Sequence, residues 1–257
     1  MSDAAERLAA ALARHDELIV AVSGGVDSLT LAAFAGRRMK ITAAHAVSPA
    51  VPPDATARVR AMASAEGWTL RILDAREFSD PAYLKNPLNR CYFCKTNLYA
   101  RIAEAMDGTI ASGANIDDLG EYRPGLTAAA EHGVVHPYVE AGISKAELRA
   151  LAASLGLGDV ATLPAQPCLA SRVETGIAID AADLRFIEEM ETLAAGAERV
   201  ADIRCRITAE GVKLESSAPV ADDALAAIRA RCRAEDRPFA GLFPYRRGSA
   251  FLTDAGA

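Results

Sequence analysis

The sequence predicts an α/β fold in which a doubly wound parallel sheet is followed by a small α+β domain. Short apolar runs alternate with helical patterns from Leu18 to about Leu155, and the pattern changes after Gly176. The 257 residues are 51% hydrophobic, which is enough for one large core, or for one medium and one small core. Strands that alternate with helices form parallel sheets. We therefore place the domains at residues 1–175 and 176–257.

The expected elements follow from apolar periodicity. Residues 1–15 form an alanine-rich amphipathic stretch. Residues 75–90 contain two prolines and no clear period, so they predict a long loop, and residues 163–168 predict a second irregular segment. In the first domain we expect strands 18–22, 40–47, 69–74, 108–114 and 134–139, and helices 28–37, 54–66, 95–106, 125–132 and 144–155. In the second domain we expect helices 180–195 and 221–235, and strands 200–208, 211–217 and 239–245.

Charge and composition narrow the class of partner. The net charge of -6 and the pI near 5.3 leave no overall basic field for a polyanion, which favours a small substrate over a nucleic acid. We find no signal-peptide core and no apolar run of membrane-spanning length, so we expect a cytoplasmic protein without a membrane partner. Five cysteines that include a C-x-x-C indicate metal or redox chemistry in a reducing compartment.

A glycine-rich turn joins the first expected strand to the first long helix. Its residues are Ser23, Gly24, Gly25, Val26, Asp27 and Ser28. Two consecutive glycines let backbone N–H groups converge on an anion, and the helix start adds its positive dipole end. Both serine hydroxyls can donate to phosphate oxygens, whereas a carboxylate in such a loop indicates Mg²⁺. The pattern is neither a Walker A motif nor G-x-G-x-x-G.

Polar residues follow several of the expected strands at one edge of the sheet. Ligands of doubly wound sheets bind at the carboxyl ends of the strands. We expect four residues there, namely Ser23, Ser48, Asp74 and Asn115.

The cysteine pattern suggests a site of its own. Cys91 and Cys94 precede Lys95 and a helical pattern, so the second thiol is expected near a helix N-terminus, where a thiolate is favoured. No second C-x-x-C or histidine pair completes a zinc site. Cys168 supplies a third sulfur, and three thiolates can hold a 4Fe-4S cluster with one open iron. A redox dithiol plus an unrelated cysteine is the alternative.

Other notable residues have plainer explanations. Strand alternation puts Ile203, Cys205 and Ile207 on one face and two arginines on the other. We expect Cys205, and Cys232 on its helix, to be core thiols. Three histidines show neither the spacing of metal ligands nor that of a catalytic triad, and we expect them to be structural: His45, His132 and His136.

Three motifs together resemble the LarE family. They are Ser-Gly-Gly-Val-Asp-Ser at 23–28, the segment 112–125 that begins Ser-Gly-Ala-Asn-Ile-Asp-Asp, and Cys-Leu-Ala-Ser-Arg at 168–172. The first resembles the PP-loop of ATP pyrophosphatases. LarE proteins are ATP-dependent sulfur transferases that build the nickel-pincer nucleotide cofactor of lactate racemase. The resemblance covers nearly the whole chain. It implies adenylation of the carboxylates of a pyridinium-3,5-dicarboxylate mononucleotide, release of AMP and pyrophosphate, and conversion to thiocarboxylates.

The resemblance also assigns roles to single residues. One branch of the family sacrifices the sulfur of the cysteine that matches Cys168, whereas the other holds a 4Fe-4S cluster on three cysteines, which here match Cys91, Cys94 and Cys168. ATP and Mg²⁺ are assigned to Ser23, Gly24, Gly25, Asp27 and Ser28, with Asp27 on the metal. The substrate phosphate is assigned to Arg204, Arg206 and Arg246. Candidates to stabilise developing charge are Lys95, Ser171 and Arg172.

The sequence leaves the roles of five acidic residues and the choice among several functions open. Glu191, Glu215 and Asp223 resemble acidic residues near the substrate but equally suit solvated surface positions, and Asp117 and Asp118 suit either the nucleotide or a turn. The competing functions are sacrificial transfer from Cys168, a tRNA thiolation enzyme, a nucleotide-binding regulator without turnover, and an amide-forming ligase. The sulfur donor is unknown. The small second domain favours a homo-oligomer, with a hexamer as the candidate size.

Overall fold

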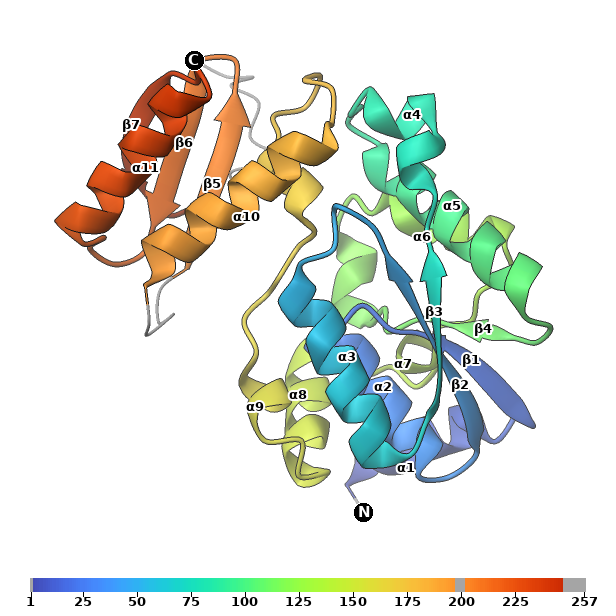
Figure 1. The fold of residues 1–257 in the computed structure, drawn as a ribbon. Helices are drawn as coiled ribbons and strands as arrows, with labels where there is room; N and C mark the ends of the chain where they lie inside the picture. Colours follow the sequence, from blue (N-terminus) through green and yellow to red (C-terminus); the bar gives the residue numbers. More distant parts are fainter. Residues whose placement is uncertain (1, 197–201, 247–257) are drawn as a thin grey trace. The chain divides into compact units, whose positions relative to one another are not determined.

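The computed structural model describes residues 2–196 and 202–246 (Figure 1). Contacts divide the chain into two compact units. Unit 1 comprises Met1–Asp80 and Asn89–Gln166, and unit 2 comprises Pro81–Leu88 and Pro167–Ala257. A unit of contacts is not the same as an independently folding domain, so the domain boundary after residue 175 stays a prediction.

Unit 1 is built on a four-stranded sheet in which every pairing is parallel, as the sequence predicts. The strand order is β3-β2-β1-β4, and Val20 of β1 pairs with Ala43 of β2 and Ala111 of β4. The strands are β1 (Glu17–Ala21), β2 (Lys40–Val47), β3 (Thr69–Asp74) and β4 (Ile110–Ala111).

Helices cover both faces of this sheet (Figure 1). Leu18 and Val20 of β1 join the larger core with α1, α2 and α8, whereas Ile19 between them joins a smaller core with α5 and α6. This alternation is what a strand buried on both faces requires. The helices of unit 1 are α1 (Asp3–Leu12), α2 (Val26–Gly36), α3 (Pro53–Glu66), α5 (Arg90–Ala105), α6 (Pro124–Glu131), α7 (Pro137–Glu140), α8 (Lys145–Ser154) and α9 (Asp159–Thr162), with 3-10 turns η1 (Glu77–Ser79) and η2 (Ile116–Gly120).

Three expectations for unit 1 need correction. The strand predicted over 134–139 is reduced to an isolated bridge between Ala111 and Val135, because Pro137 opens α7 instead. The strand predicted over 108–114 shortens to β4. The helix predicted to start at residue 95 starts at Arg90, so the C-x-x-C lies within α5 and not in a loop before it.

Unit 2 is a small α+β unit, as predicted. Its sheet has the order β5-β6-β7, with β5 and β6 antiparallel and β6 and β7 parallel. Residues 200 and 201 of the predicted strand 200–208 lie outside the described residues. The elements are α4 (Pro81–Leu84), η3 (Leu169–Arg172), α10 (Ala181–Ala195), β5 (Ile203–Thr208), β6 (Gly211–Ser216), α11 (Asp222–Ala234) and β7 (Phe239–Pro244).

The segment 81–88 belongs to unit 2 because Asn86 fixes it there. Asn86 is fully buried, has a φ of 52°, and donates its side-chain amide to the carbonyls of Val173, Glu174 and Ile177. Part of the expected loop 75–90 is therefore helical and held by a buried amide.

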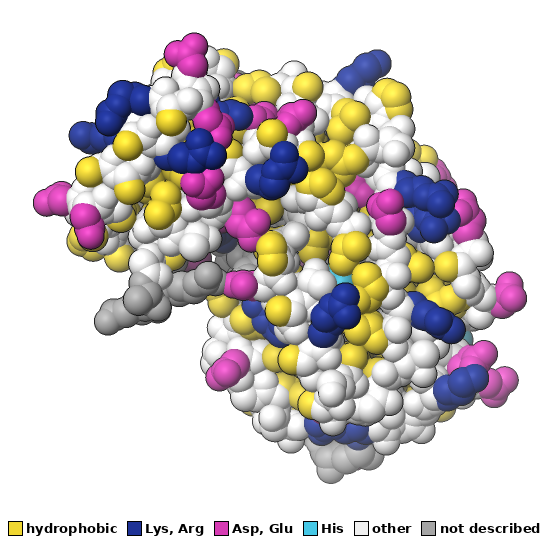
Figure 2. Space-filling view, viewed as in Figure 1, with side chains coloured by type: hydrophobic (Ala, Val, Ile, Leu, Met, Phe, Trp, Pro, Cys, Tyr) yellow, Lys and Arg dark blue, Asp and Glu magenta, His cyan; other side chains and the backbone are white. Residues whose placement is uncertain are grey.

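The surface shows charges of both signs. On the face drawn in Figure 2, Lys and Arg are interspersed with Asp and Glu, so that face carries no extended area of one sign. Within the described ranges, each helix is too short or too polar to cross a membrane.

Candidate functional site

The loop between β1 and α2 is shaped by its first glycine. Gly24 has a φ of 85°, a conformation that favours glycine, and a Cβ built there would lie 2.7 Å from the carbonyl oxygen of Ala55. The loop therefore turns sharply against α3. Gly25 is the N-cap of α2 and has no side chain to cover the first N–H groups of the helix. The start of α2 therefore has no side-chain cap, which is compatible with the phosphate loop that the sequence predicts.

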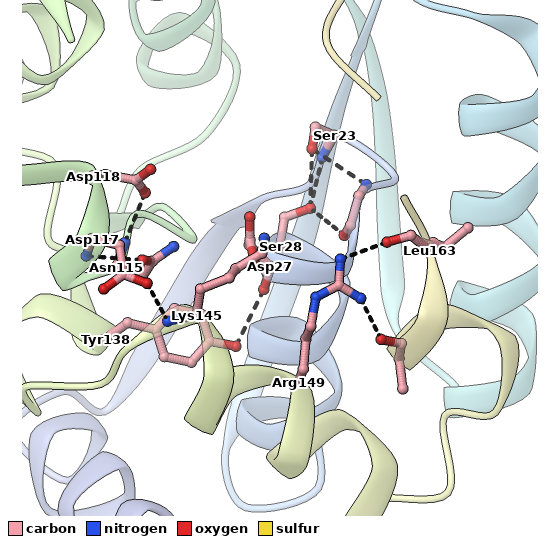
Figure 3. A network of polar contacts seen from close by, with 12 residues as sticks. Ser23, Asp27, Ser28, Asn115, Asp117, Asp118, Tyr138, Lys145, Arg149 and Leu163 are labelled. Carbon is pink, nitrogen blue, oxygen red and sulfur yellow. Dashed lines mark hydrogen bonds and ion pairs between the residues drawn. The ribbon is translucent and has the colours of Figure 1, made fainter. Parts of the chain in front are cut away.

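The two serines of the loop hold each other in place. Ser28 Oγ accepts from the Ser23 backbone N–H at 3.0 Å and lies 3.2 Å from Ser23 Oγ (Figure 3). Ser28 is buried, whereas Ser23 is exposed. Ser28 therefore closes the loop from within, and Ser23 presents its hydroxyl to solvent.

The second motif packs directly on this loop. A Cβ at Gly113 would lie 2.9 Å from the Asp27 carbonyl carbon and 2.9 Å from the Ser28 nitrogen, so only glycine allows the approach. Asn115 is buried and caps η2 by accepting from the Asp117 N–H at 3.1 Å, while Asp118 accepts from the Asn115 N–H at 3.0 Å. Asp118 thus acts in turn formation here, which is one of the two roles left open by the sequence.

Sequence reasoning missed Lys145, which forms an ion pair with Asp27 (Figure 3). The start of α8 fixes this lysine. Ser144 caps the helix, and the Lys145 backbone N–H donates to Asp117 Oδ2 at 2.9 Å. The Tyr138 hydroxyl donates to the Asp27 carbonyl at 3.2 Å. A cation beside a glycine-rich loop can neutralise negative charge, and the Ser-x-x-Glu capping box of Ser144 and Glu147 was the only local signal of this position.

Two further residues, Arg58 and His45, form hydrogen bonds to the backbone of the loop or of Val22 just before it. Arg58 of α3 donates to the Gly24 carbonyl at 2.6 Å, and burial lowers the pKa of its guanidinium. The Nδ1 of His45 lies 2.8 Å from the Val22 carbonyl, and its Nε2 lies 2.9 Å from Thr56 Oγ1. Since a carbonyl only accepts, Nδ1 carries the proton. Burial lowers the pKa of the His45 imidazole, which favours this neutral, structural form.

Cys91, Cys94 and Lys95 lie in the first turns of α5 in unit 1. Residues three apart share one helix face, so both thiols point to the same side. A Cβ at Gly125 would lie 2.9 Å from Lys95 Cγ and 3.5 Å from the Cys91 carbonyl, so the start of α6 packs against this turn. All five cysteines are among the described residues, and no disulfide joins any of them.

The segment Cys168–Arg172 in unit 2 is organised by its arginine. Arg172 is 4% exposed and forms a bidentate ion pair with Glu191 of α10, at 2.9 and 3.2 Å. Its Nη1 also donates to the carbonyls of Pro167 and Cys168, and the Ser171 hydroxyl donates to the Cys168 carbonyl at 2.8 Å. Glu191 further accepts from the Cys205 N–H of β5 at 3.0 Å. In this arrangement Arg172 fixes the backbone that carries the Cys168 thiol.

The arginine face of β5 follows the predicted alternation. Ile203, Cys205 and Ile207 are buried, while Arg204 and Arg206 lie half-buried on the opposite side. Arg206 pairs with Glu215 of β6 at 2.9 Å. The Arg204 guanidinium lies 5.5 Å from the Tyr245 ring centroid, and burial, with the charge of Arg172 nearby, lowers its pKa.

The other predicted residues of unit 2 are dispersed. Asp223 is exposed in the first turn of α11, and Arg246 is exposed after β7. Glu191 and Glu215 each pair with an arginine, so neither is a merely solvated carboxylate. The buried thiols of Cys205 and Cys232 match the core role expected for them, and burial raises the pKa of both.

The residues expected to bind metals lie in both units. Across the described ranges, no three side chains of His, Cys, Asp or Glu come together as a metal site. Two cysteines on one helix face suit two ligands of an iron–sulfur cluster, and Cys168 belongs to the other unit. The Asp27 carboxylate at the glycine-rich loop is the kind of ligand that suits Mg²⁺, which is bound in proteins by one or two carboxylates plus substrate phosphates.

The parallel sheet and the loop between β1 and α2 are consistent with an α/β protein of the PP-loop class. No protein-family model matches the chain. The uncharacterized protein slr1717 of Synechocystis sp. is 38% identical over 182 residues, a match that covers 68% of each chain. The chain therefore belongs to one family with that protein.

Two more distant relatives extend this relationship. The uncharacterized protein MJ0830 of Methanocaldococcus jannaschii is 27% identical over 199 residues, covering 74% of this chain and 76% of the relative. The pyridinium-3,5-bisthiocarboxylic acid mononucleotide synthase of Lactiplantibacillus plantarum is 32% identical over 157 residues, covering 58% of this chain and 57% of the synthase. The chain is thus a distant homologue of a LarE-type synthase.

Proposed function

We propose that this protein is an ATP-dependent sulfurtransferase of nickel-pincer cofactor biosynthesis. Its substrate in this proposal is a pyridinium-3,5-dicarboxylate mononucleotide, whose carboxylates become thiocarboxylates. The observation that carries the proposal is the phosphate loop at the start of α2, with Gly24 turned against α3 and Gly113 packed on it, in a homologue of a synthase named for such a product.

The first step proposed is adenylation. A substrate carboxylate oxygen attacks the α-phosphorus of ATP, the bond to the bridging oxygen breaks, and pyrophosphate leaves. The N–H groups of the loop and the Ser23 hydroxyl hold the β and γ phosphates. Mg²⁺ held by Asp27 would neutralise phosphate charge when bound. Lys145 stays beside the loop and stabilises charge on the departing pyrophosphate.

The second proposed step is displacement of AMP by sulfur at the acyl carbon. Cys91, Cys94 and Cys168 would hold a 4Fe-4S cluster whose fourth iron is open to a sulfide ligand. Arg172 fixes the Cys168 backbone through the Pro167 and Cys168 carbonyls, and Glu191 holds Arg172. Lys95, one residue after the second thiol, supplies positive charge at the same helix start.

Arg204 and Arg206, with Arg246, are the proposed binders of the substrate phosphate. Arginine is suited to bidentate phosphate recognition. Glu215 lies opposite Arg204 in the sheet and pairs with Arg206, which aligns the guanidinium groups before substrate arrives.

The proposal is tested by product analysis with ATP, sulfide and the dicarboxylate mononucleotide. We expect AMP, pyrophosphate and thiocarboxylate in equal yield per acyl group, and Asp27→Ala should abolish all three. Asp54→Ala, which removes an acidic residue at the start of α3, is the matched control and should keep activity. Release of ADP and phosphate would contradict the proposal.

The source of sulfur is tested separately. Protein prepared without oxygen should contain about four irons per chain, and serine at position 91, 94 or 168 should remove them, whereas Cys232→Ala should not. The sacrificial alternative predicts activity without iron, at most one sulfur per chain, and dehydroalanine at position 168 by peptide mass spectrometry. That second result would overturn the cluster and keep the ATP-dependent reaction.

A further inference from the structure

The face of the unit 2 sheet that carries Arg204 and Arg206 has two rows of side chains. Strand pairing places Arg204, Glu215 and Phe243 in one row, and it places Arg206, Lys213 and Gly241 in the next. Residues that pair directly share a face of the sheet. The opposite face carries Cys205, Leu214 and Leu242, and there Cys205 and Leu214 are fully buried. Phe243 therefore lies on the arginine face.

The Phe243 ring is supported and open to solvent. A Cβ at Gly241 would lie 3.4 Å from its Cε2 and 3.5 Å from its Cζ, and Gly241 has a φ of 138°, which favours glycine. The ring thus lies over bare backbone. The Lys213 ammonium is 5.7 Å from the ring centroid, and 41% of Phe243 is exposed. A large aromatic side chain at this level of exposure leaves π surface available to a ligand.

The neighbouring charges indicate what kind of ligand suits this ring. Arg206 pairs with Glu215 and Lys213 pairs with Glu210. Arg204 brings a further positive charge to this face, which favours an anionic group. The Phe243 ring attracts cations and flat aromatic rings. β5 and β7 flank β6, so Arg204 and Phe243 stand at the two ends of one row, about 10 Å apart across the sheet. A mononucleotide with a cationic ring combines both features, because its phosphate is negative and its pyridinium is positive and flat.

We infer that Phe243 is a substrate-specificity residue, which stacks on the pyridinium ring of the nucleotide whose phosphate is bound by Arg204 and Arg206. This inference rests on the proposed function. Gly241 lets the ring lie close to the strand, and the Lys213 ammonium over the ring, 5.7 Å from its centroid, leaves 41% of Phe243 exposed to a ligand. The stacking selects pyridinium mononucleotides over sugar phosphates that carry no aromatic ring.

The test measures binding of two probes by calorimetry to the full-length protein. Nicotinic acid mononucleotide carries both a phosphate and a pyridinium ring, whereas ribose 5-phosphate carries only the phosphate. Phe243→Ala should weaken nicotinic acid mononucleotide about tenfold and leave ribose 5-phosphate unchanged. Phe243→Trp should keep both affinities. Leu242→Ala is the matched control, because Leu242 is also 41% exposed but lies on the other face of β7, and it should change neither.

The outcomes separate this inference from the proposed function. The double variant Arg204→Ala, Arg206→Ala should weaken both probes. If the double variant does so but Phe243→Ala binds both probes normally, or weakens both equally, the stacking role is overturned. If the double variant keeps both affinities, the proposed phosphate site is wrong. A change in oligomer size in Phe243→Ala, with unchanged affinities, would assign the ring to contact between copies of the chain instead.

Discussion

The loop between β1 and α2 and the segment around Arg172 are organised in opposite ways. The loop is shaped by backbone: Gly24 turns it, Gly25 leaves the helix start bare, and Ser28 closes it through neighbours five residues away at most. The Arg172 segment is shaped by a buried ion pair with Glu191, which is 19 residues away. A loop shaped by its backbone conformation, such as the one at Gly24, tolerates few residue types at its key positions. A segment held by a side-chain ion pair, such as the one at Arg172, depends instead on a partner far away in the sequence.

This difference has energetic consequences. Substitutions in the loop act through steric fit and should affect ligand binding locally. Substitutions at Arg172 or Glu191 leave an unpaired charge in a buried position, which costs far more than an exposed pair contributes. The predictions below test this contrast, from the largest expected effect to the smallest.

The largest effect is expected for Arg172→Ala. It leaves Glu191, which is 17% exposed, without its partner, and it frees the Pro167 and Cys168 carbonyls. Breaking a buried pair on one side costs about 3–5 kcal/mol. Chemical denaturation should show this loss in the free energy of unfolding. Arg231→Ala removes more exposed ion pairs with Glu189 and Glu235 and should cost much less. Equal losses in the two variants would contradict the assigned role of Arg172.

The second effect compares two glycines in unit 1. Gly24→Ala meets both a positive φ and a contact of 2.7 Å with the Ala55 carbonyl, whereas Gly67→Ala has a φ of 69° and nothing within 4 Å. Both variants pay about 1–2 kcal/mol for the left-handed conformation. Only Gly24→Ala should lower the free energy of unfolding by more than this amount. It should also lose ATP binding, measured by calorimetry. ATP binding that survives Gly24→Ala would show that the loop shape is not required.

A smaller effect is expected for Lys145→Ala. The lysine is paired with Asp27 and partly exposed, so the free energy of unfolding should change by less than about 1 kcal/mol. Loss of its charge beside the bound triphosphate should lower kcat/KM for AMP formation about tenfold, which is about 1.4 kcal/mol. Lys40→Ala removes an exposed pair with Glu17 and should leave kcat/KM unchanged. A normal rate in Lys145→Ala would return this residue to a purely structural role.

The smallest effect concerns His45 and pH. An unfolded imidazole has a pKa of about 6.5, and burial lowers the pKa of His45 in the folded protein. The folded state therefore binds fewer protons than the unfolded state. The stability that neutral His45 contributes is lost as pH falls through about 6.5 toward the folded pKa. Burial lowers the pKa of His136 in the same direction. The unfolding free energy should fall less between pH 7 and pH 5 in His45→Gln than in wild type, and an identical pH dependence would refute this account.

The sequence predicts unit 1 well where local rules act. The double glycine, the apolar run before it and the helix after it all lie between Glu17 and Gly36, and the parallel sheet follows from alternation. It fails at Val135, because an apolar run that contains Pro137 satisfies a strand pattern but begins a helix. It also places the start of α5 too late, because a C-x-x-C has the same spacing in a loop as in a helical turn.

The residues that sequence reasoning missed have partners far away along the chain. Lys145 reaches Asp27 across 118 positions, and Tyr138 reaches it across 111. Such pairs are fixed by the fold and not by local pattern. Arg172 and Glu191 illustrate the same limit. Each was named from the sequence, but their mutual ion pair and its contact with the β5 backbone became visible only in the structure.

The central claim is that the loop activates a substrate carboxylate at the α-phosphorus of ATP. It is tested most directly with dicarboxylate mononucleotide labelled with ¹⁸O in its carboxylates. Attack by a carboxylate oxygen on the α-phosphorus, followed by displacement by sulfur, leaves that oxygen on AMP. Mass spectrometry should therefore find one ¹⁸O in each AMP and none in pyrophosphate. Label in inorganic phosphate, or unlabelled AMP formed together with thiocarboxylate, would contradict the claim.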